Sequence, residues 1–425
     1  MAISFKWPIL GVIVPSILIG MIGYGSHYFV FTSHLNSRDQ LWFEFYLSMV
    51  WISYIIAIFK QPGSPPHGFQ PNQGEWRRWC KKCKNYKPER SHHCKSCKKC
   101  VLQMDHHCPW TMNCVGHDNI AHFLRFLLWV IWTTGYVMIQ LSKRAIQYYE
   151  ESNLPAYLIN KSEMIAVIFL LPIDFFVFAT IVVLFIRCVI NFFFKGMTQI
   201  EVWESERIEG QIHTERFWNQ IKRNYFRLHN KELPRLTSWR NENERTNYDE
   251  NDEDKDTSST NNDINENSSV PEEFTFDDLI FPYDLGIWNN IVSNCGSPWK
   301  WILPWGGTNS SGYKFEKSGE FIEDDQLGLP WPPDGGHQEN GDGGEINRGD
   351  IELQNMRRPN YRLLKKRLDP RSTMKRTEWM NDLGETLDDL GVDIDAEDTD
   401  NEELIVVGGN SNNDNDNNSA HNTTA

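Results

Sequence analysis

Cysteine and histidine are concentrated in one segment of this 425-residue chain. Seven of the nine cysteines fall between Cys80 and Cys114, where Cys-x2-Cys steps let a turn present two thiolates to one tetrahedral ion. Two four-ligand sites need eight ligands, and the segment offers eleven: its seven cysteines with His92, His93, His106 and His107. Three residues are left over, and spacing alone does not name them. The pattern indicates metal or thiol chemistry and not the disulfides of a secreted protein.

Four long apolar runs flank the Cys-rich segment, two before it and two after it, and would hold it in position. Four runs, residues 8–31, 41–59, 123–141 and 164–194, are long enough to cross a membrane and too uniformly apolar for helices of a soluble protein. Eleven Lys and Arg lie from residue 60 to residue 122, more than the other short loops carry. The positive-inside rule therefore places the Cys-rich segment and both termini in the cytosol. Because the segment has few aliphatic residues, we expect structural zinc to stabilise it, with two sites favoured over one.

Asp174 and Arg187 lie inside the fourth apolar run. A charge at that depth is a functional candidate by default. In the alternative, which the sequence favours, Arg187 extends its head to the cytosolic surface and Asp174 bonds a neighbouring helix.

Residues 105–108 read Asp-His-His-Cys, and Pro109 and Trp110 follow them. On this motif the sequence closely resembles the Asp-His-His-Cys (DHHC) family of protein S-acyltransferases (palmitoyltransferases), over all four apolar runs and the whole Cys-rich segment. Further residues stand where the family has them: Lys87, Pro88, Arg90, His93, Cys94, Asn119 and Phe123. We therefore expect an all-α polytopic membrane protein. It would have four transmembrane helices, a cytosolic Cys-rich two-zinc domain between helices 2 and 3, and a largely disordered C-terminal tail.

The resemblance also implies a set of ligands. One zinc ion would be bound by Cys80, Cys83, His93 and Cys100, and the second by Cys94, Cys97, His107 and Cys114. Cys108 is then free of metal, with His106 and Asp105 beside it. A Cys108 thiolate is a good nucleophile toward a thioester, His106 can take its proton, and Asp105 can hold the imidazole in the useful tautomer. The alternatives for Cys108 are a redundant zinc ligand or an inert buried thiol.

The implied reaction has two steps. Cys108 attacks palmitoyl-CoA and becomes S-acylated, and a cysteine of a protein substrate then attacks that intermediate. The acyl chain would lie between the helices, and the CoA phosphates near basic residues at the cytosolic face. The expected partners are palmitoyl-CoA, membrane proteins with cytosolic cysteines, and the lipid bilayer. The alternative function is a membrane-anchored zinc-binding adaptor or ubiquitin-ligase-like module. A transporter or channel fits less well, because few intramembrane groups are polar.

A short motif follows the fourth apolar run. The family has Thr-Thr-x-Glu there, and this chain has Thr-Gln-x-Glu: Thr198 and Glu201 match, and Gln199 departs. We expect Thr198, Glu201 and Asn119 to be structural. Thr198 and Glu201 either brace the zinc segment by hydrogen bonds or serve as a helix cap and a solvated acid.

The sequence divides into parts of unlike composition. We expect transmembrane helices 1 and 2 in residues 1–59, the zinc-binding domain in 60–122, helices 3 and 4 with a short lumenal loop in 123–194, a juxtamembrane segment in 195–240, a disordered linker in 241–270, an aromatic motif region in 271–340 and a mostly disordered charged tail in 341–425. We find no internal repeat. Residues 281–290 look like a family motif that packs against the membrane domain. A basic patch at residues 357–376 lacks interleaved aromatics, so we expect no nucleic-acid partner.

Residues 198–201, 283–286 and 331–335 look most like the fungal, endoplasmic-reticulum-resident branch of the family. This likeness implies a multi-pass protein of the endoplasmic reticulum membrane with cytosolic N- and C-termini. By analogy with that branch, chitin synthase is the expected protein substrate.

Overall fold

The computed structural model describes residues 9–72, 74–153, 155, 159–236, 274–301, 306–308, 310–336 and 369–396. The expected linker at residues 241–270 lies outside the described residues. So do residues 341–368 and 397–425 of the expected charged tail, and with them most of the basic patch.

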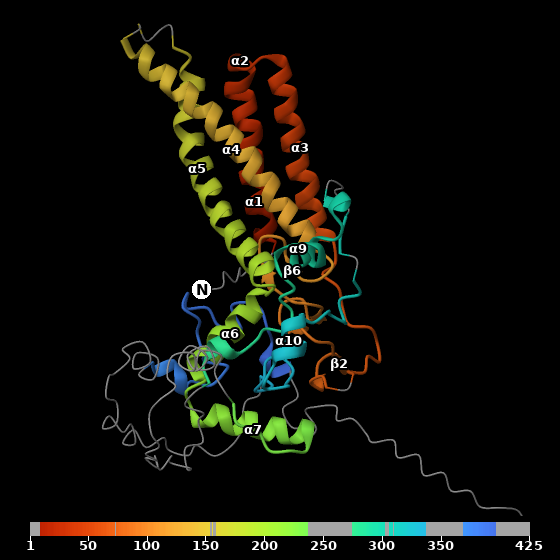
Figure 1. Cartoon of the computed structure of the whole chain (residues 1–425). Coiled ribbons are helices and arrows are strands. Elements are labelled where there is room, and N and C mark those ends of the chain that lie inside the picture. The colour runs from red at the N-terminus through yellow and green to blue at the C-terminus, as the bar shows by residue number, and fades with distance from the viewer. Residues whose placement is uncertain are drawn as a thin grey trace, which may run out of the picture.

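Within those ranges, four helices are long and apolar enough to cross a membrane: Leu10–His34, Ser37–Phe59, Ile120–Glu150 and Lys161–Phe194. They consist of α1 (Leu10–Ser26) continued by η1 (His27–Phe31) and α2 (Thr32–His34), then α3 (Ser37–Phe59), α4 (Ile120–Glu150), and α5 (Lys161–Val189) continued by η3 (Ile190–Phe194). The helices form one bundle, and the segment between α3 and α4 lies with α6, α7 and α10 at one end of it (Figure 1). The predicted count of four is confirmed.

Helices α3 and α5 begin before the apolar runs that predicted them, because their N-caps are polar. Asn36 accepts a hydrogen bond from the Asp39 N–H at 2.9 Å and so starts α3. Asn160 does the same for α5, accepting from the Glu163 N–H at 3.4 Å. Polar residues at a helix end satisfy backbone donors that the helix itself leaves free, so an apolar run underestimates the helix that contains it.

Apolar side chains fill the inside of the bundle and also cover its outside. Leu47, Val137 and Leu170 are buried between helices, while Phe169 and Trp132 are more than half exposed on the surface that lipid would cover. Asp174 is fully buried in α5, and neither of its carboxylate oxygens has a hydrogen-bond partner in the described part of the chain. The bond from Asp174 to a neighbouring helix, which the sequence favoured, is therefore not observed.

The Cys-rich segment between α3 and α4 folds into short antiparallel hairpins. Its strands are β1 (Arg78–Cys80), β2 (Asn85–Lys87), β3 (His92–Cys94), β4 (Lys99–Val101), β5 (His106–Cys108) and β6 (Asn113–Val115). They pair as β1 with β2, β3 with β4 and β5 with β6. Each hairpin turn contains a residue with a positive φ, at Lys84, Lys98 and Met112.

The hairpins are a repeat. Cys80, Cys94 and Cys108 are equally spaced in the sequence, and each ends the first strand of its hairpin. The paired residues also correspond: Cys80 pairs with Asn85, Cys94 with Lys99 and Cys108 with Asn113. The expectation of no internal repeat was wrong: cysteine recurs at the same place in each hairpin, although most of the other side chains differ from one copy to the next.

Short helices follow the bundle: α6 (Gln199–Gln211), α7 (Glu215–His229), η4 (Phe276–Asp278), α9 (Ile287–Cys295), η5 (Pro298–Trp301) and α10 (Gly319–Asp324). The aromatic motif packs back against the membrane domain, as expected. Asn290 Nδ2 donates to the Phe193 carbonyl oxygen at 3.1 Å. The Arg90 guanidinium lies over the Tyr283 ring, 4.7 Å from its centroid. These contacts join the motif to both the end of α5 and the hairpins.

Residues 369–396, which we call the C-terminal strap, run across the hairpins and contain η6 (Pro370–Thr373) and η7 (Ile394–Ala396). Trp379, Leu387 and Val392 are buried in one cluster with Cys94 and Trp203. Val392 also forms an isolated β-bridge with Cys94. The acidic composition of this segment predicts a mostly disordered tail and hides the few apolar residues that make these contacts.

Candidate active site and metal centres

Two groups among the described residues could each hold a metal ion: Cys80, Cys83, His93 and Cys100, and Cys94, Cys97, His107 and Cys114. The ligand atoms of each group lie within 4.8 Å of one another. In the first, His93 Nδ1 is 3.3 Å from Cys80 Sγ and 3.7 Å from Cys100 Sγ. In the second, Cys97 Sγ is 3.4 Å from Cys114 Sγ. Tetrahedral zinc with Zn–S bonds of ~2.3 Å holds its sulfurs ~3.8 Å apart, so both groups fit the ion.

These are the two ligand sets that the family resemblance implies. Each set takes a Cys-x2-Cys pair from one hairpin turn and a histidine with a cysteine from the next hairpin. The third turn has Cys108 and Thr111 in the pair positions, and α4 follows in place of another hairpin. Cys108 therefore has the place of a ligand but belongs to neither group. This repeat is a sequence signal that could have singled out Cys108 without the family.

Asp105, His106 and Cys108 lie together on β5 and the residue before it. His106 Nδ1 is 2.6 Å from Asp105 Oδ2, and the His106 ring packs edge-on against Phe123. The other carboxylate oxygen, Asp105 Oδ1, accepts a hydrogen bond from the Gln199 backbone N–H at 2.7 Å. Asp105 is fully buried and Cys108 is 5% exposed. Both carboxylate oxygens of Asp105 thus have a hydrogen-bond partner, and the bond to Nδ1 orients the His106 imidazole.

The electrostatics of this trio favour a thiolate and an imidazolium. Burial raises the pKa of the Cys108 thiol, but His106 and Thr111 outweigh burial, and the net pKa lies below the ordinary cysteine value. Burial lowers the pKa of His106, but Asp105 and Cys108 outweigh it and raise the pKa to about 10. Each group stabilises the charged form of the other, which is the arrangement of an activated cysteine nucleophile.

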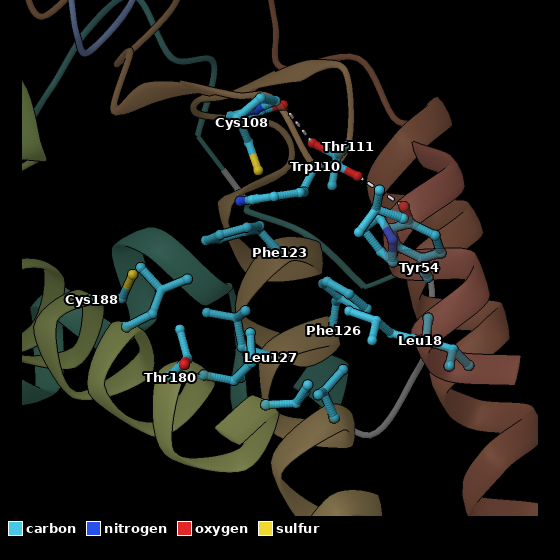
Figure 2. Close-up of a pocket in the computed structure, with 18 of the residues that line it drawn as sticks. Leu18, Tyr54, Cys108, Trp110, Thr111, Phe123, Phe126, Leu127, Thr180 and Cys188 are labelled. Carbon is cyan, nitrogen blue, oxygen red and sulfur yellow. Dashed lines mark hydrogen bonds between the residues drawn. The ribbon is translucent and has the colours of Figure 1, made fainter. Parts of the chain in front are cut away.

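The trio opens onto a cavity of about 470 Å³ inside the helix bundle. Figure 2 shows the Cys108 sulfur pointing into this cavity, above Phe123. The walls come from α1, α3, α4 and α5 and are mostly apolar; they include Val14, Leu18, Ile22, Leu47, Tyr54, Phe126, Leu127, Val130, Val177, Ile181 and Leu184. Such a cavity suits a long apolar chain whose reactive end lies at the sulfur.

Tyr54 joins the reactive turn to the bundle, and the sequence analysis did not single it out. The Tyr54 hydroxyl, from α3, donates to the Trp110 carbonyl oxygen at 2.8 Å (Figure 2). On the other side, α1 approaches the same turn so closely that a Cβ at Gly11 would clash with the Pro109 carbonyl oxygen. The turn that carries Cys108 is therefore held between two membrane helices.

The juxtamembrane motif braces the site. Thr198 caps α6, accepting from the Glu201 N–H at 3.3 Å, while the Glu201 carboxylate accepts from the Thr198 N–H at 2.8 Å. Glu201 also binds Arg90 through two hydrogen bonds of 2.6 Å. Thr198 is thus a helix cap, and Glu201 is a buried brace and not a solvated acid. Gln199 stands where the family motif has a second threonine. It still donates a hydrogen bond to Asp105, because the donor is its backbone N–H.

Asn119 organises the junction between the hairpins and α4. Its Oδ1 accepts from the Gly116 N–H at 2.8 Å, and its Nδ2 donates to the Cys114 carbonyl oxygen at 2.8 Å. A second bond from Nδ2 reaches the Lys60 carbonyl oxygen at 3.2 Å, where α3 ends. Asn119 therefore ties together the chain entering the hairpins and the chain leaving them.

The C-terminal strap supplies part of the cavity wall. Glu385, Asp389 and Leu390 line the cavity together with Cys108. The His107 N–H donates to the Leu390 carbonyl oxygen at 2.9 Å. Sequence reasoning missed all three residues, since nothing in their local pattern marks a site.

Comparisons with known proteins agree with this architecture. The DHHC palmitoyltransferase family matches residues 73–206, which span the hairpins, α4, α5 and the start of α6. Proteins named palmitoyltransferase PFA4 are similar over nearly the whole chain. The protein of Debaryomyces hansenii is 60% identical over 95% of this chain and 98% of its own length. Those of Candida albicans and Saccharomyces cerevisiae are 48% and 40% identical, each over 93% of this chain and 100% of its own length.

The chain therefore belongs to the DHHC palmitoyltransferase family, and it is a protein S-palmitoyltransferase. The adaptor and transporter alternatives are set aside by this assignment.

Proposed function

We propose that the chain transfers a palmitoyl group from palmitoyl-CoA, through an acyl-Cys108 intermediate, to cytosolic cysteines of membrane proteins. One observation carries the proposal. Both metal-binding groups leave out Cys108, whose sulfur instead faces an apolar cavity with His106 and Asp105 beside it. A thiol in a ligand's place, without the ligand's partners, is available for covalent chemistry.

The first step acylates the enzyme. His106 takes the thiol proton, and the Cys108 sulfur attacks the thioester carbonyl carbon of palmitoyl-CoA. The carbon–sulfur bond to CoA breaks, and the CoA thiolate takes the proton from His106. Asp105 keeps the imidazole aligned, a role supported by its 2.6 Å contact with His106 Nδ1. The acyl chain enters the cavity among the helices.

The second step reverses these roles. His106 takes the proton of the substrate cysteine, whose sulfur attacks the acyl-Cys108 carbonyl carbon. The Cys108 sulfur leaves and recovers the proton from His106. Because one thioester replaces another, the reaction is nearly isoenergetic, and the site has mainly to activate a thiol and exclude water from the acyl chain.

Acyl labelling tests the intermediate. Purified full-length protein in nanodiscs is incubated with radiolabelled palmitoyl-CoA, and a hydroxylamine-sensitive label is expected on the parent. Cys108→Ala should abolish it, whereas Cys295→Ser, which removes a cysteine outside both metal groups, should keep it. A Cys108→Ala protein that labels as strongly as the parent would exclude the mechanism.

We propose two structural Zn²⁺ ions, one in each four-residue group. When bound, they cross-link successive hairpins and hold β5, with its His106 and Cys108, in place. A strong chelator should abolish labelling together with the folded signal of the hairpins, measured as protease resistance of residues 74–119. Loss of labelling with the hairpins still protected, or better recovery with a redox-active metal than with zinc, would contradict a structural role.

For the cell, we propose that the protein lies in the endoplasmic reticulum membrane with both termini cytosolic and acts on chitin synthase. The concentration of Lys and Arg in the hairpin segment supports the topology. The compartment and the substrate rest on the resemblance to the fungal branch described above. Fluorescence microscopy of the tagged full chain and acyl-exchange labelling of chitin synthase, with and without Cys108→Ala, test them.

A further inference from the structure

The C-terminal strap is fixed against the hairpin that carries the reactive residues. Beyond the bond from the His107 N–H to Leu390, the Lys95 N–H donates to the Gly391 carbonyl oxygen at 3.0 Å. Gly391 has φ +86°, and a Cβ there would lie 2.6 Å from His107 Cβ. Only glycine allows the strap to run this close to β5. The strap therefore has a defined position relative to the site.

Within the strap, Glu385 is held rigidly and faces the end of α5. Its carboxylate accepts two hydrogen bonds from Arg187, at 3.1 Å and 2.6 Å. Asn381 Nδ2 donates to the same carboxylate at 3.0 Å, and the Trp203 indole N–H donates to the Glu385 carbonyl oxygen at 2.9 Å. Glu385 is thus a pre-set bidentate partner for the guanidinium.

Without Glu385, Arg187 would have another acid to pair with in the same cavity. Arg187 and Asp105 both line that cavity. Asp105 is fully buried and already serves His106 and the Gln199 amide. A guanidinium offers five donors in a planar fork that matches a carboxylate. A free Arg187 would therefore compete with His106 for Asp105.

We propose that Glu385 is a positioning residue for acyl transfer: it holds Arg187 away from Asp105, so that Asp105 keeps His106 aligned on Cys108. The inference rests on the proposed function and deepens it. It also gives the strap a role in the reaction and explains why an arginine can line the same cavity as the reactive acid without pairing with it.

A double-mutant cycle tests this role. The parent, Glu385→Gln, Arg187→Gln and the double variant are compared by the initial rate of acyl-Cys108 formation, as a function of palmitoyl-CoA, with full-length protein in nanodiscs. Glu385→Gln keeps the side-chain size and removes the charge. We expect it to lower the saturated rate about tenfold, with a nearly unchanged KM for palmitoyl-CoA, because the imidazole is misaligned.

Arg187→Gln removes the competing cation, so the double variant should be as fast as Arg187→Gln alone and several-fold faster than Glu385→Gln. The informative result is that adding Arg187→Gln restores the rate that Glu385→Gln has lost. A strap whose only role is structural would not give this rescue. If the ion pair only anchors the strap, both single variants and the double variant should be equally slow. That result, or a Glu385→Gln protein as fast as the parent, would overturn the inference.

Asp388→Asn provides the matched control, because Asp388 lies in the same strap but pairs with Lys95 at the surface. It should behave as the parent. Zinc content and protease resistance of the strap are measured for every variant, so that a misfolded protein is recognised. A parent that shows no Cys108-dependent label would refute the proposed function itself. A normally labelled parent without the rescue pattern would refute only the role of Glu385.

Discussion

Cys108 and the proposed zinc ligands Cys80 and Cys94 occupy the same place in three equally spaced turns, yet only Cys108 is proposed to react. In the first two turns, the N–H of the second cysteine donates to the sulfur of the first at 3.3 Å. In the third turn, the Thr111 hydroxyl donates to the Cys108 carbonyl oxygen at 3.4 Å. A neutral hydroxyl is a poor zinc ligand beside thiolates. The residue type at position 111 is thus one difference between the proposed nucleophile and the proposed ligands, and the absence of a hairpin after the third turn is the other.

Thr111→Cys should therefore turn the third turn into a metal-binding pair. With His106 adjacent, the turn would offer three ligands to an ion. We expect added zinc to inhibit labelling of this variant at a concentration at least ~10-fold lower than for the parent, and a mild chelator to restore the label. Thr111→Ser, which keeps the hydroxyl, should respond like the parent. Equal zinc sensitivity of the two variants would show that Thr111 does not protect Cys108 from metal.

At the scale of elements, the start of α6 is part of the site. The first N–H groups of a helix carry partial positive charge and lack partners within the helix. The Gln199 N–H, directly after the Thr198 cap, gives its hydrogen bond to Asp105. The capping box of Thr198 and Glu201 fixes where the helix begins and hence where that donor points. A local folding signal thereby positions an acid on a distant hairpin.

Thr198→Ala should affect the reaction more than its effect on stability explains. Loss of a threonine cap costs about 1 kcal/mol, and here it also frees the Gln199 amide to move. We expect the rate of acyl-Cys108 formation to fall about tenfold at saturating palmitoyl-CoA. Thr214→Ala is the matched control, since Thr214 caps α7 in the same way, accepting from the Phe217 N–H at 3.3 Å. Similar rates in the two variants would mean that the cap acts through stability alone.

At the scale of the whole molecule, the sequence predicted those features that depend on one segment of the chain or on its composition. Cys-x2-Cys steps and long apolar runs carry their meaning within one segment, so the Cys-rich centre and the membrane helices could be found. The choice of Cys108 came from the family resemblance, although the repeat of turns also contains it. The pairing of Glu385 with Arg187 could not be found, because it joins residues far apart in the chain. The Gln199 contact uses the backbone, which leaves no trace in residue type.

A buried ion network joins the parts that the sequence treated separately. Glu204 of α6 accepts from Arg207 Nε at 2.8 Å and from Arg376 Nε of the strap at 2.8 Å. Arg207 also forms an ion pair with Asp334 at 2.8 Å. All of these side chains are at most 9% exposed. Removal of one charge from such a network leaves the others buried without compensation, which is far costlier than loss of a surface pair.

The stability that Glu204 provides should depend on pH in a defined direction. Burial raises the pKa of Glu204, but Arg376 and Arg207 outweigh burial and lower it to about 2. Since the folded pKa lies below the unfolded value of about 4.3, this contribution is complete above about pH 5 and is lost as the pH falls toward 2. At pH 7, Glu204→Gln should lower the free energy of unfolding by about 3–5 kcal/mol, measured by thermal or denaturant unfolding with strap proteolysis as the readout.

Acid also releases zinc from thiolates, so the difference between the parent and Glu204→Gln at each pH is the informative quantity. That difference should shrink steadily from pH 5 to pH 3, because protonation makes the parent resemble the variant. Asp388→Asn, which breaks an exposed pair with Lys95, should change stability by less than about 1 kcal/mol at every pH. A difference that stays constant, or grows, as the pH falls would mean that the network between α6 and the strap is not held by the charge of Glu204.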